Sequence, residues 1–230
     1  MIFPPVGPRW SGYLLDLINL GNQTQRKVEF HRVPESMLST FKNHSHKFEV
    51  LEDRDNWDYV YKRSDLVELP GDQYEKVRKK MNKFKRVNQW QYKSINPEIV
   101  DILLRMQDLW CRYKACSEDV TLDQENEGII EILNRWDELD IFGGAIFVKE
   151  IPVAYSIGEK LNDDTVVIHI EKASYEYQGA YQAIATEFPG HIDSKYRFIN
   201  REQDLGEAGL RRSKQSYHPD HFIKKYIIKT

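Results

Sequence analysis

The chain has 230 residues, a length that fits one large domain or two small ones. Hydrophobic residues make up 40% and aromatic residues 12%, which is enough for a packed core and excludes global disorder. The formal net charge is -3, from 33 basic and 36 acidic residues, so any anionic partner has to be held by a local basic patch.

No apolar run approaches the roughly 18 residues of a membrane span, and the N-terminus lacks the layout of a signal peptide. We therefore expect a soluble, cytoplasmic protein, which leaves open a peripheral contact with a membrane surface or a lipid head group. Cys111 and Cys116 stand five residues apart in a segment with helical spacing, which places them on different faces of a helix. We expect them to be reduced, as in the cytoplasm.

The histidines give no reason to expect a metal. The two-residue spacing of His44 and His46 fits one face of a strand, but no third ligand follows at the spacing of a zinc site. His169 alternates with apolar neighbours and fits a strand residue better than a catalyst. We expect no metal site.

Residues 1–70 predict short helices and strands in the order α-β-α-β-β, which repeats the order near the end of the chain. We infer an incomplete N-terminal copy of the domain that follows. Apolar spacing predicts helices over 10–20 and 35–43 and strands over 27–32, 48–52 and 57–62.

Residues 88–230 predict one complete α+β domain with a mixed sheet, because hairpin strands are enclosed by helices. The element order β-α-α-β-β-β-α-β-α-β resembles that of the GNAT-like (acyl-CoA N-acyltransferase) fold. The predicted elements are strand 90–95, a helix from 97, a second helix around 129–136, strands 142–149, 153–159 and 165–171, helix 179–188, strand 196–200, helix 207–217 and strand 222–228.

A basic helix over 73–87, within a connecting segment 71–87, separates the two units. Its apolar stripe includes Val77 and Phe84, and Glu75 is its only acid. Like charges at three- and four-residue spacings destabilise a helix, so this surface favours a counter-anion such as the phosphates of tRNA or of a lipid surface. A solvated linker helix is the alternative. The anion-binding candidates are Arg78, Lys79, Lys80, Lys83, Lys85 and Arg86.

Three stretches match motifs of a known family, in order and at its spacing. They are Tyr59-Val60-Tyr61 with Leu69-Pro70-Gly71, His169-Ile170-Glu171-Lys172-Ala173 with Gly179-Ala180-Tyr181, and Phe198-Ile199-Asn200-Arg201-Glu202-Gln203-Asp204-Leu205-Gly206 with Gly209-Leu210-Arg211. On these residues the chain resembles the C-terminal domain of phosphatidylglycerol lysyltransferases over about residues 50 to 226. The resemblance implies tandem GNAT-like domains related to Fem-type aminoacyl transferases, which move an amino acid from aminoacyl-tRNA to a lipid head group or a peptidoglycan amine.

Acyl transfer needs a positioned nucleophile, a proton acceptor and a stabilised oxyanion. Glu171 ends a β-branched strand and is the candidate general base, or the anchor for an amino group of the donor; a surface salt bridge is the alternative. Asn200, Arg201 and Glu202 end the next strand, and the guanidinium suits a carboxylate or phosphate unless it is paired with Glu202 or Glu171.

Further residues are candidates for substrate binding. Arg211, Lys214 and Tyr217 follow at three-residue steps and are expected on one side of the last helix, and Asp204 is either a ligand contact or an N-cap. The substrate-binding candidates are Lys172, Gly179, Tyr181, Asp204, Arg211, Lys214 and Tyr217.

The start of the helix at Gly179 bears on the donor. Coenzyme A-dependent GNAT members carry Gln/Arg-x-x-Gly-x-Gly/Ala there, whereas this chain has Glu176-Tyr177-Gln178-Gly179-Ala180-Tyr181. The acid repels a pyrophosphate, so coenzyme A is disfavoured and no cofactor is expected. The leading prediction is aminoacyl-tRNA-dependent transfer to a lipid or small-molecule acceptor. The alternatives are an N-acyltransferase with another donor and a catalytically degenerate binding module.

Overall fold

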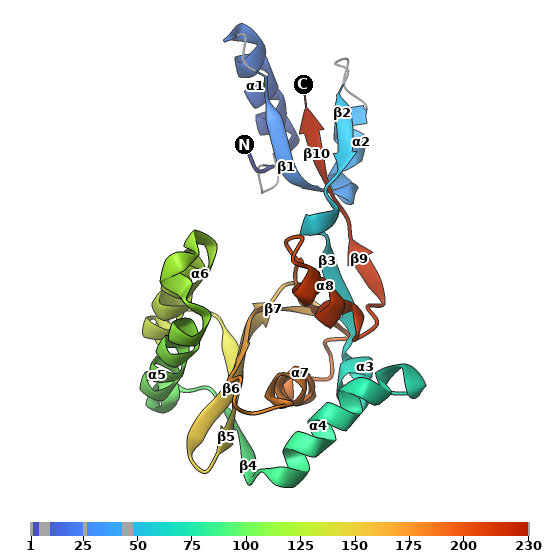
Figure 1. Ribbon diagram of the computed structural model, residues 1–230. Coiled ribbons are helices and arrows are strands. Elements are labelled where there is room, and N and C mark those ends of the chain that lie inside the picture. The colour runs from blue at the N-terminus through green and yellow to red at the C-terminus, as the bar shows by residue number, and fades with distance from the viewer. Residues whose placement is uncertain (1, 5–9, 25–26, 43–47, 230) are drawn as a thin grey trace. The chain divides into compact units, whose positions relative to one another are not determined.

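The structure, a computed structural model, describes residues 2–4, 10–24, 27–42 and 48–229 (Figure 1). The chain divides into two compact units. We call Met1–Val60, Glu202–Gln215 and Pro219–Thr230 the terminal unit, and Tyr61–Arg201 with Ser216–His218 the core unit. These boundaries differ from the predicted ones at 70 and 87, because the last part of the chain packs mainly with the first 60 residues.

The core unit is built on a sheet in the order β4-β5-β6-β7-β8. The first four strands are antiparallel neighbours, whereas β8 pairs with β7 in parallel, as the predicted mixed sheet requires. The β7–β8 register joins only Thr165, Val166 and Val167 to β8, and β7 continues beyond it to Ala173. The strands are β4 (Trp90–Ser94), β5 (Phe142–Val148), β6 (Ile151–Lys160), β7 (Thr165–Ala173) and β8 (Phe198–Asn200).

Helices cover both faces of this sheet (Figure 1). The helices α5 (Pro97–Lys114) and α6 (Val120–Asn134) pack on one face, where Leu103, Leu133 and Tyr155 belong to one buried apolar cluster. The opposite face holds α7 (Ala180–His191), with α3 (Arg63–Glu68) and the basic helix α4 (Glu75–Val87) packed against it. Because α7 follows β7 and precedes β8, the ends of these two strands become the natural place for a site.

The terminal unit contains a small sheet in the order β1-β10-β2, both outer strands antiparallel to β10. Its core includes Leu14, Ile18, Phe30, Phe41 and Ile228. The elements are α1 (Trp10–Gln23), β1 (Glu29–Pro34), α2 (Leu38–Lys42), β2 (Glu49–Glu52), the first part of β3 (Asp58–Lys62), α8 (Ala208–Gln215), β9 (His221–Ile223) and β10 (Lys225–Lys229). The last two residues of β3, Tyr61 and Lys62, belong to the core unit.

Two predicted details of the strands are wrong. One strand was expected over 222–228, but β9 pairs with β3 while β10 pairs with β1 and β2, so the chain changes sheet at Lys224. The strands expected over 142–149 and 153–159 are separated by a shorter turn than predicted. This turn falls on Lys149 and Glu150, which have φ angles of 49° and 66°, and Ile151 already belongs to β6. Positive φ at both central residues is typical of a tight hairpin turn.

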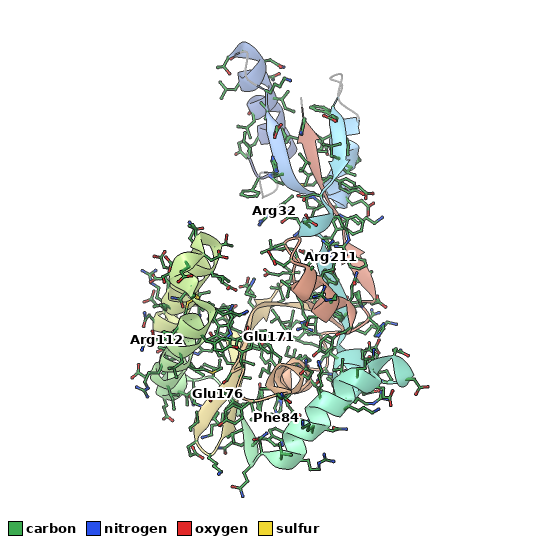
Figure 2. All side chains as sticks on the ribbon, in the orientation of Figure 1. Arg32, Phe84, Arg112, Glu171, Glu176 and Arg211 are labelled. Atoms are coloured by element: carbon green, nitrogen blue, oxygen red, sulfur yellow. A yellow bond between two sulfur atoms is a disulfide. The ribbon has the colours of Figure 1, made fainter. Side chains whose placement is uncertain are left out.

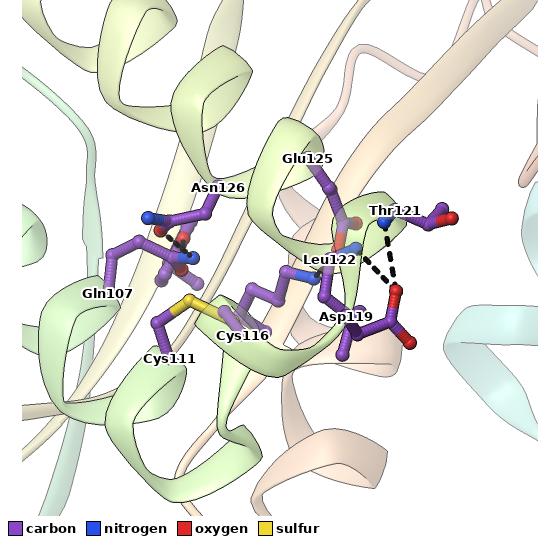
Figure 3. Close-up of a disulfide and its surroundings, with 10 residues drawn as sticks. Gln107, Cys111, Cys116, Asp119, Thr121, Leu122, Glu125 and Asn126 are labelled. Atoms are coloured by element: carbon purple, nitrogen blue, oxygen red, sulfur yellow. Dashed lines mark hydrogen bonds and ion pairs between the residues drawn. A yellow bond between two sulfur atoms is a disulfide. The ribbon is translucent and has the colours of Figure 1, made fainter.

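The prediction of reduced cysteines is also wrong, since Cys111 and Cys116 form a disulfide with Cα atoms 5.2 Å apart (Figure 3). Helix α5 ends at Lys114, and Ala115 takes a left-handed conformation with φ 51° and ψ 48°. The chain therefore turns back and brings Cys116 beside Cys111, whereas a continuous helix would have separated them. The cysteines therefore no longer support a cytoplasmic location. That location stays a prediction.

No described helix is long and apolar enough to cross a membrane. Among the same residues, no group of three or more His, Cys, Asp or Glu side chains is arranged to hold a metal ion. His44 and His46 lie outside the described residues.

Candidate active site at the separation of β7 and β8

The structure brings Glu171 and Arg201 together. Nη2 of Arg201 donates a hydrogen bond to Oε1 of Glu171 at 2.6 Å. Glu171 (labelled in Figure 2) lies on β7 four residues beyond Val167, the last residue paired with β8, and Arg201 directly follows the end of β8. The ion pair therefore bridges the place where the two strands separate.

The surroundings of this pair are apolar and aromatic. The two side chains are only 15% and 10% exposed, and the Arg201 guanidinium carbon lies 5.7 Å from the Tyr61 ring centroid and 4.8 Å from that of Tyr217. Both tyrosines are buried, and burial raises the pKa of Tyr217, so its hydroxyl stays neutral. Tyr74 fixes the main chain here by donating its hydroxyl proton to the Tyr217 carbonyl oxygen at 2.9 Å. Charge interactions are stronger in such a low-dielectric setting.

The second carboxylate oxygen of Glu171 is not used by the ion pair with Arg201. Oε2 of Glu171 is buried and has no hydrogen-bond partner among the described residues. Buried polar atoms in native proteins nearly always have a partner, and a carboxylate oxygen accepts protons or hydrogen bonds from amines and hydroxyls. The geometry can therefore receive an N–H or O–H group from a ligand.

Lys172 and Tyr181, predicted to bind substrate, lie in a different cluster. Successive side chains of a strand point to opposite faces, so Lys172 points away from Glu171, toward α5 and α6. Its Nζ lies 2.7 Å from Oε2 of Glu125 and 4.0 Å from the Trp110 ring centroid. Trp110 donates its indole N–H to the Tyr181 hydroxyl at 3.2 Å. Burial lowers the pKa of Lys172, and Glu125 partly offsets this effect.

Gly179 is required where α7 begins. Its φ is 94°, and a Cβ there would overlap the main-chain carbonyl oxygen of Lys80 and lie 2.9 Å from Cβ of Phe84 (labelled in Figure 2). Helix α4 therefore approaches the backbone of this loop, and a groove of about 530 Å³ lies beside it. The groove is lined by Lys79, Lys80, Lys83, Gln178, Gly179 and Gln182.

The six predicted anion-binding residues of α4 divide into three groups. Arg78 donates to the carbonyl oxygens of Leu69 and Gly71, and Lys85 forms an ion pair with Glu187, so both serve internal contacts. Lys79 pairs with Glu75 of the same helix, both side chains being exposed. The remaining Lys80, Lys83 and Arg86 are exposed, and none forms an ion pair with any residue that the structure describes.

In the terminal unit, Asp204 is the centre of an internal network. It is fully buried and accepts hydrogen bonds from the Tyr59 hydroxyl at 2.5 Å, from Arg211 Nε at 2.8 Å and from the Gly206 amide at 2.9 Å. Burial acts to raise the pKa of Asp204, but these hydrogen bonds hold it well below its usual range. Asp204 is not the N-cap of α8, which begins at Ala208.

The other predicted site residues are divided between the two units. Glu202 and Lys214 are linked within the terminal unit, because Lys214 Nζ donates to the Glu202 carbonyl oxygen at 3.2 Å. Asn200 is buried in β8. The prediction that Arg211, Lys214 and Tyr217 share one side of a helix is wrong, because α8 ends at Gln215 and Tyr217 belongs to the core unit.

Sequence reasoning did not assign functions to three residues that shape these clusters: Tyr61, Trp110 and Glu125. Tyr61 belongs to one of the matched family motifs. That motif was the signal by which sequence reasoning could have chosen Tyr61 as a neighbour of the active site. No local signal pointed to Glu125 or Trp110, since their contacts with Lys172 join residues 47 and more positions apart.

A mixed sheet whose parallel strands separate, with two helices on one face and one following helix on the other, is the GNAT-like fold, as predicted. Known structures of a tandem GNAT protein and of FemX share this fold. The model of the family described as phosphatidylglycerol lysyltransferase, C-terminal, matches residues 1–229, and the chain belongs to this family.

The chain is also similar to individual proteins and solved structures. A conserved protein of unknown function from Bacteroides thetaiotaomicron is 31% identical with a TM-score of 0.90, and the match covers 99% of this chain and 78% of that one. The C-terminal domain of a putative lysylphosphatidylglycerol synthetase from Agrobacterium fabrum is 12% identical with a TM-score of 0.72, over 99% and 76% of the two chains. An uncharacterized protein of Mycoplasmoides gallisepticum is 22% identical over 74% of this chain, and the match spans 55% of that protein's length.

Proposed function

We propose that this domain transfers an aminoacyl group from aminoacyl-tRNA to an amine or hydroxyl of a lipid or small molecule, at the Glu171–Arg201 pair. The family and the GNAT-like fold support an aminoacyl transferase in general. The observation that carries the proposed site is the buried Oε2 of Glu171, which lacks a partner among the described residues, at the separation of β7 and β8.

In this proposal Glu171 acts as the general base. Arg201 binds Oε1 and fixes the orientation of the carboxylate, so that Oε2 accepts the proton of the attacking amine or hydroxyl. The acceptor atom forms a bond to the carbonyl carbon of the aminoacyl ester, and the bond from that carbon to the ribose oxygen breaks. Glu171 then donates this proton to the ribose oxygen as that oxygen leaves. The reaction therefore ends with a free ribose hydroxyl and with Glu171 again a carboxylate.

The basic groove supports tRNA as the donor. Lys79, Lys80 and Lys83 face a groove of about 530 Å³, and Gln178 and Gln182 at the start of α7 line its other side. A row of lysines beside the N-terminus of a helix favours phosphate, because both contribute positive potential. Phosphates of the tRNA backbone match this surface in charge.

The loop at Gly179 also supports the exclusion of coenzyme A. In coenzyme A-dependent relatives the glycine lets a pyrophosphate approach the backbone, whereas here the space beside Gly179 is taken by the Lys80 carbonyl and by Phe84. Glu176 (Figure 2) adds an exposed negative charge to the same loop.

The test is transfer of label from radiolabelled aminoacyl-tRNA to components of a total lipid extract. Glu171→Gln is expected to lower the single-turnover rate by about 100-fold or more, as for loss of a general base. Glu159→Gln, on the neighbouring strand β6, is the matched control and is expected to leave the rate unchanged. Transfer that is unaffected by Glu171→Gln and by Arg201→Ala would rule out this site. Transfer of an acyl group from an acyl-CoA, and not from aminoacyl-tRNA, would rule out the proposed donor.

Filter binding of uncharged tRNA over a salt series tests the groove separately. Replacing Lys79, Lys80 and Lys83 with Gln is expected to weaken binding and to flatten its dependence on salt by about 0.7 to 0.9 per lost phosphate contact. Lys160→Gln and Lys195→Gln, which remove exposed charges far from α4 in sequence, are the controls. An unchanged salt slope in the triple variant would return α4 to a purely structural role.

A further inference from the structure

A second cavity of the core unit, of about 390 Å³, is not used by the proposed reaction. It is lined by the end of α7 and the segment that leads to β8, together with residues of β4 and β5. The segment precedes β8, whereas Arg201 follows that strand, so the cavity is separate from the Glu171–Arg201 pair. Its aromatic walls are formed by Tyr92, Trp136, Phe142, Phe188 and Tyr196.

The lining of the cavity carries a negative charge and no Lys or Arg. Asp193 is the only acid among the lining residues. His191 stacks on Tyr92, with ring centroids 3.7 Å apart and an interplanar angle of 11°, and its Nδ1 is hydrogen-bonded to the carbonyl oxygen of Glu187 at 2.8 Å. Aromatic faces carry negative potential and attract cations, and a carboxylate at the rim adds to that attraction.

A lysine of the chain already occupies the rim of this region. Nζ of Lys195 lies 3.7 Å from Oδ2 of Asp193 and 4.9 Å from the Tyr196 ring centroid. The Lys195 side chain is 61% exposed, so the contact is weak and easily displaced. An ammonium group is thus the kind of ion that these two residues attract.

We propose that this cavity binds an organic ammonium cation. Its methyl or methylene groups pack against Trp136, Phe142 and Tyr196, and its charge faces Asp193 in the place that the Lys195 ammonium approaches. The volume falls within the range of small-molecule sites, about 300 to 1,000 Å³. A neutral or anionic ligand of the same shape gains the apolar contacts but lacks the attraction to Asp193.

The experiment uses two probes of nearly the same shape, choline and its uncharged analogue 3,3-dimethyl-1-butanol. Each is titrated into the full chain while the indole N–H signal of Trp136 is followed by NMR, with the signal assigned through Trp136→Phe. We expect a saturable shift with choline and a response at least five-fold weaker with the alcohol. The signals of the other tryptophans serve as internal controls and are expected to stay in place.

Two variants separate the charge from the shape of the cavity. Asp193→Asn keeps the oxygen that accepts the Lys195 amide hydrogen bond at 2.9 Å, and it is expected to weaken choline binding at least five-fold. Lys195→Gln removes the internal competitor and is expected to tighten it. Asp108→Asn, an exposed acid of α5, is the matched control. Equal responses to both probes, equal shifts of all indole signals, or an unchanged affinity in Asp193→Asn would overturn the proposal.

Discussion

Glu171 lies on β7, Arg201 directly follows the parallel strand β8, and the two side chains meet at 2.6 Å just beyond the point where the strands stop pairing. The distance in sequence is 30 residues, and the helix α7 lies between them along the chain. The pair is therefore a product of the fold, and its two members depend on each other because both are buried.

The first prediction concerns this dependence. Arg201→Met leaves Glu171 buried without its cation, and we expect the free energy of unfolding to fall by about 3 kcal/mol. The double variant Arg201→Met with Glu171→Leu removes both charges and is expected to regain a large part of that loss. Urea denaturation of the two single variants and the double variant measures the coupling. Strictly additive effects would show that the pair contributes no mutual stabilisation.

The second prediction concerns Gly179. Its φ of 94° and the closeness of Lys80 and Phe84 leave no room for a side chain. We expect Gly179→Ala to lower the free energy of unfolding by about 2 kcal/mol, from backbone strain and overpacking. Gly190, in the same helix α7, has no atom within 4 Å of an added Cβ. Gly190→Ala is therefore the control and is expected to be neutral or to stabilise by about 0.5 kcal/mol. Similar losses in both variants would contradict the steric argument.

The third prediction concerns the disulfide between Cys111 and Cys116. It closes a short loop, for which the chain-entropy model gives a stabilisation of about 2 kcal/mol. Reduction with dithiothreitol is expected to lower the melting temperature of the wild type. The variant with both cysteines replaced by Ser is expected to melt at a lower temperature and to be insensitive to the reductant. A wild-type protein that carries two free thiols after purification without reductant would contradict the disulfide.

The fourth prediction concerns the pH dependence of stability. Because the folded-state pKa of Asp204 lies below that of an unfolded aspartate, its stabilising contribution is complete above about pH 4. The contribution is lost as the pH falls through the lower folded-state value. We expect Asp204→Asn to be less stable at pH 7, and its stability to fall less steeply between about pH 5 and pH 2. Asp163→Asn, at a fully exposed acid, is the control. Parallel pH profiles of wild type and Asp204→Asn would refute the role of this carboxylate.

The sequence by itself determined the order of the elements between residues 90 and 200, whereas α3 (Arg63–Glu68) was not predicted. The apolar spacing that predicted the strands and helices between residues 90 and 200 reflects burial of one face or both faces, which is a local property of each segment. The matched motifs identified the family, and candidate site residues were placed at the ends of the strands that became β7 and β8. Glu171 and Arg201 were both chosen on this basis, and their mutual ion pair stood among the alternatives.

Only the tertiary structure decided which of the chosen residues meet. Lys172 contacts Glu125 and Trp110, Tyr181 contacts Trp110, and Asp204 is held within the terminal unit by Tyr59 and Arg211. The disulfide depends on one left-handed residue, Ala115, and the separation of β9 from β10 depends on which strands they pair with. These outcomes rest on long-range packing and on single backbone conformations. Periodicity records which face of a segment is buried, but it does not record what that face is buried against.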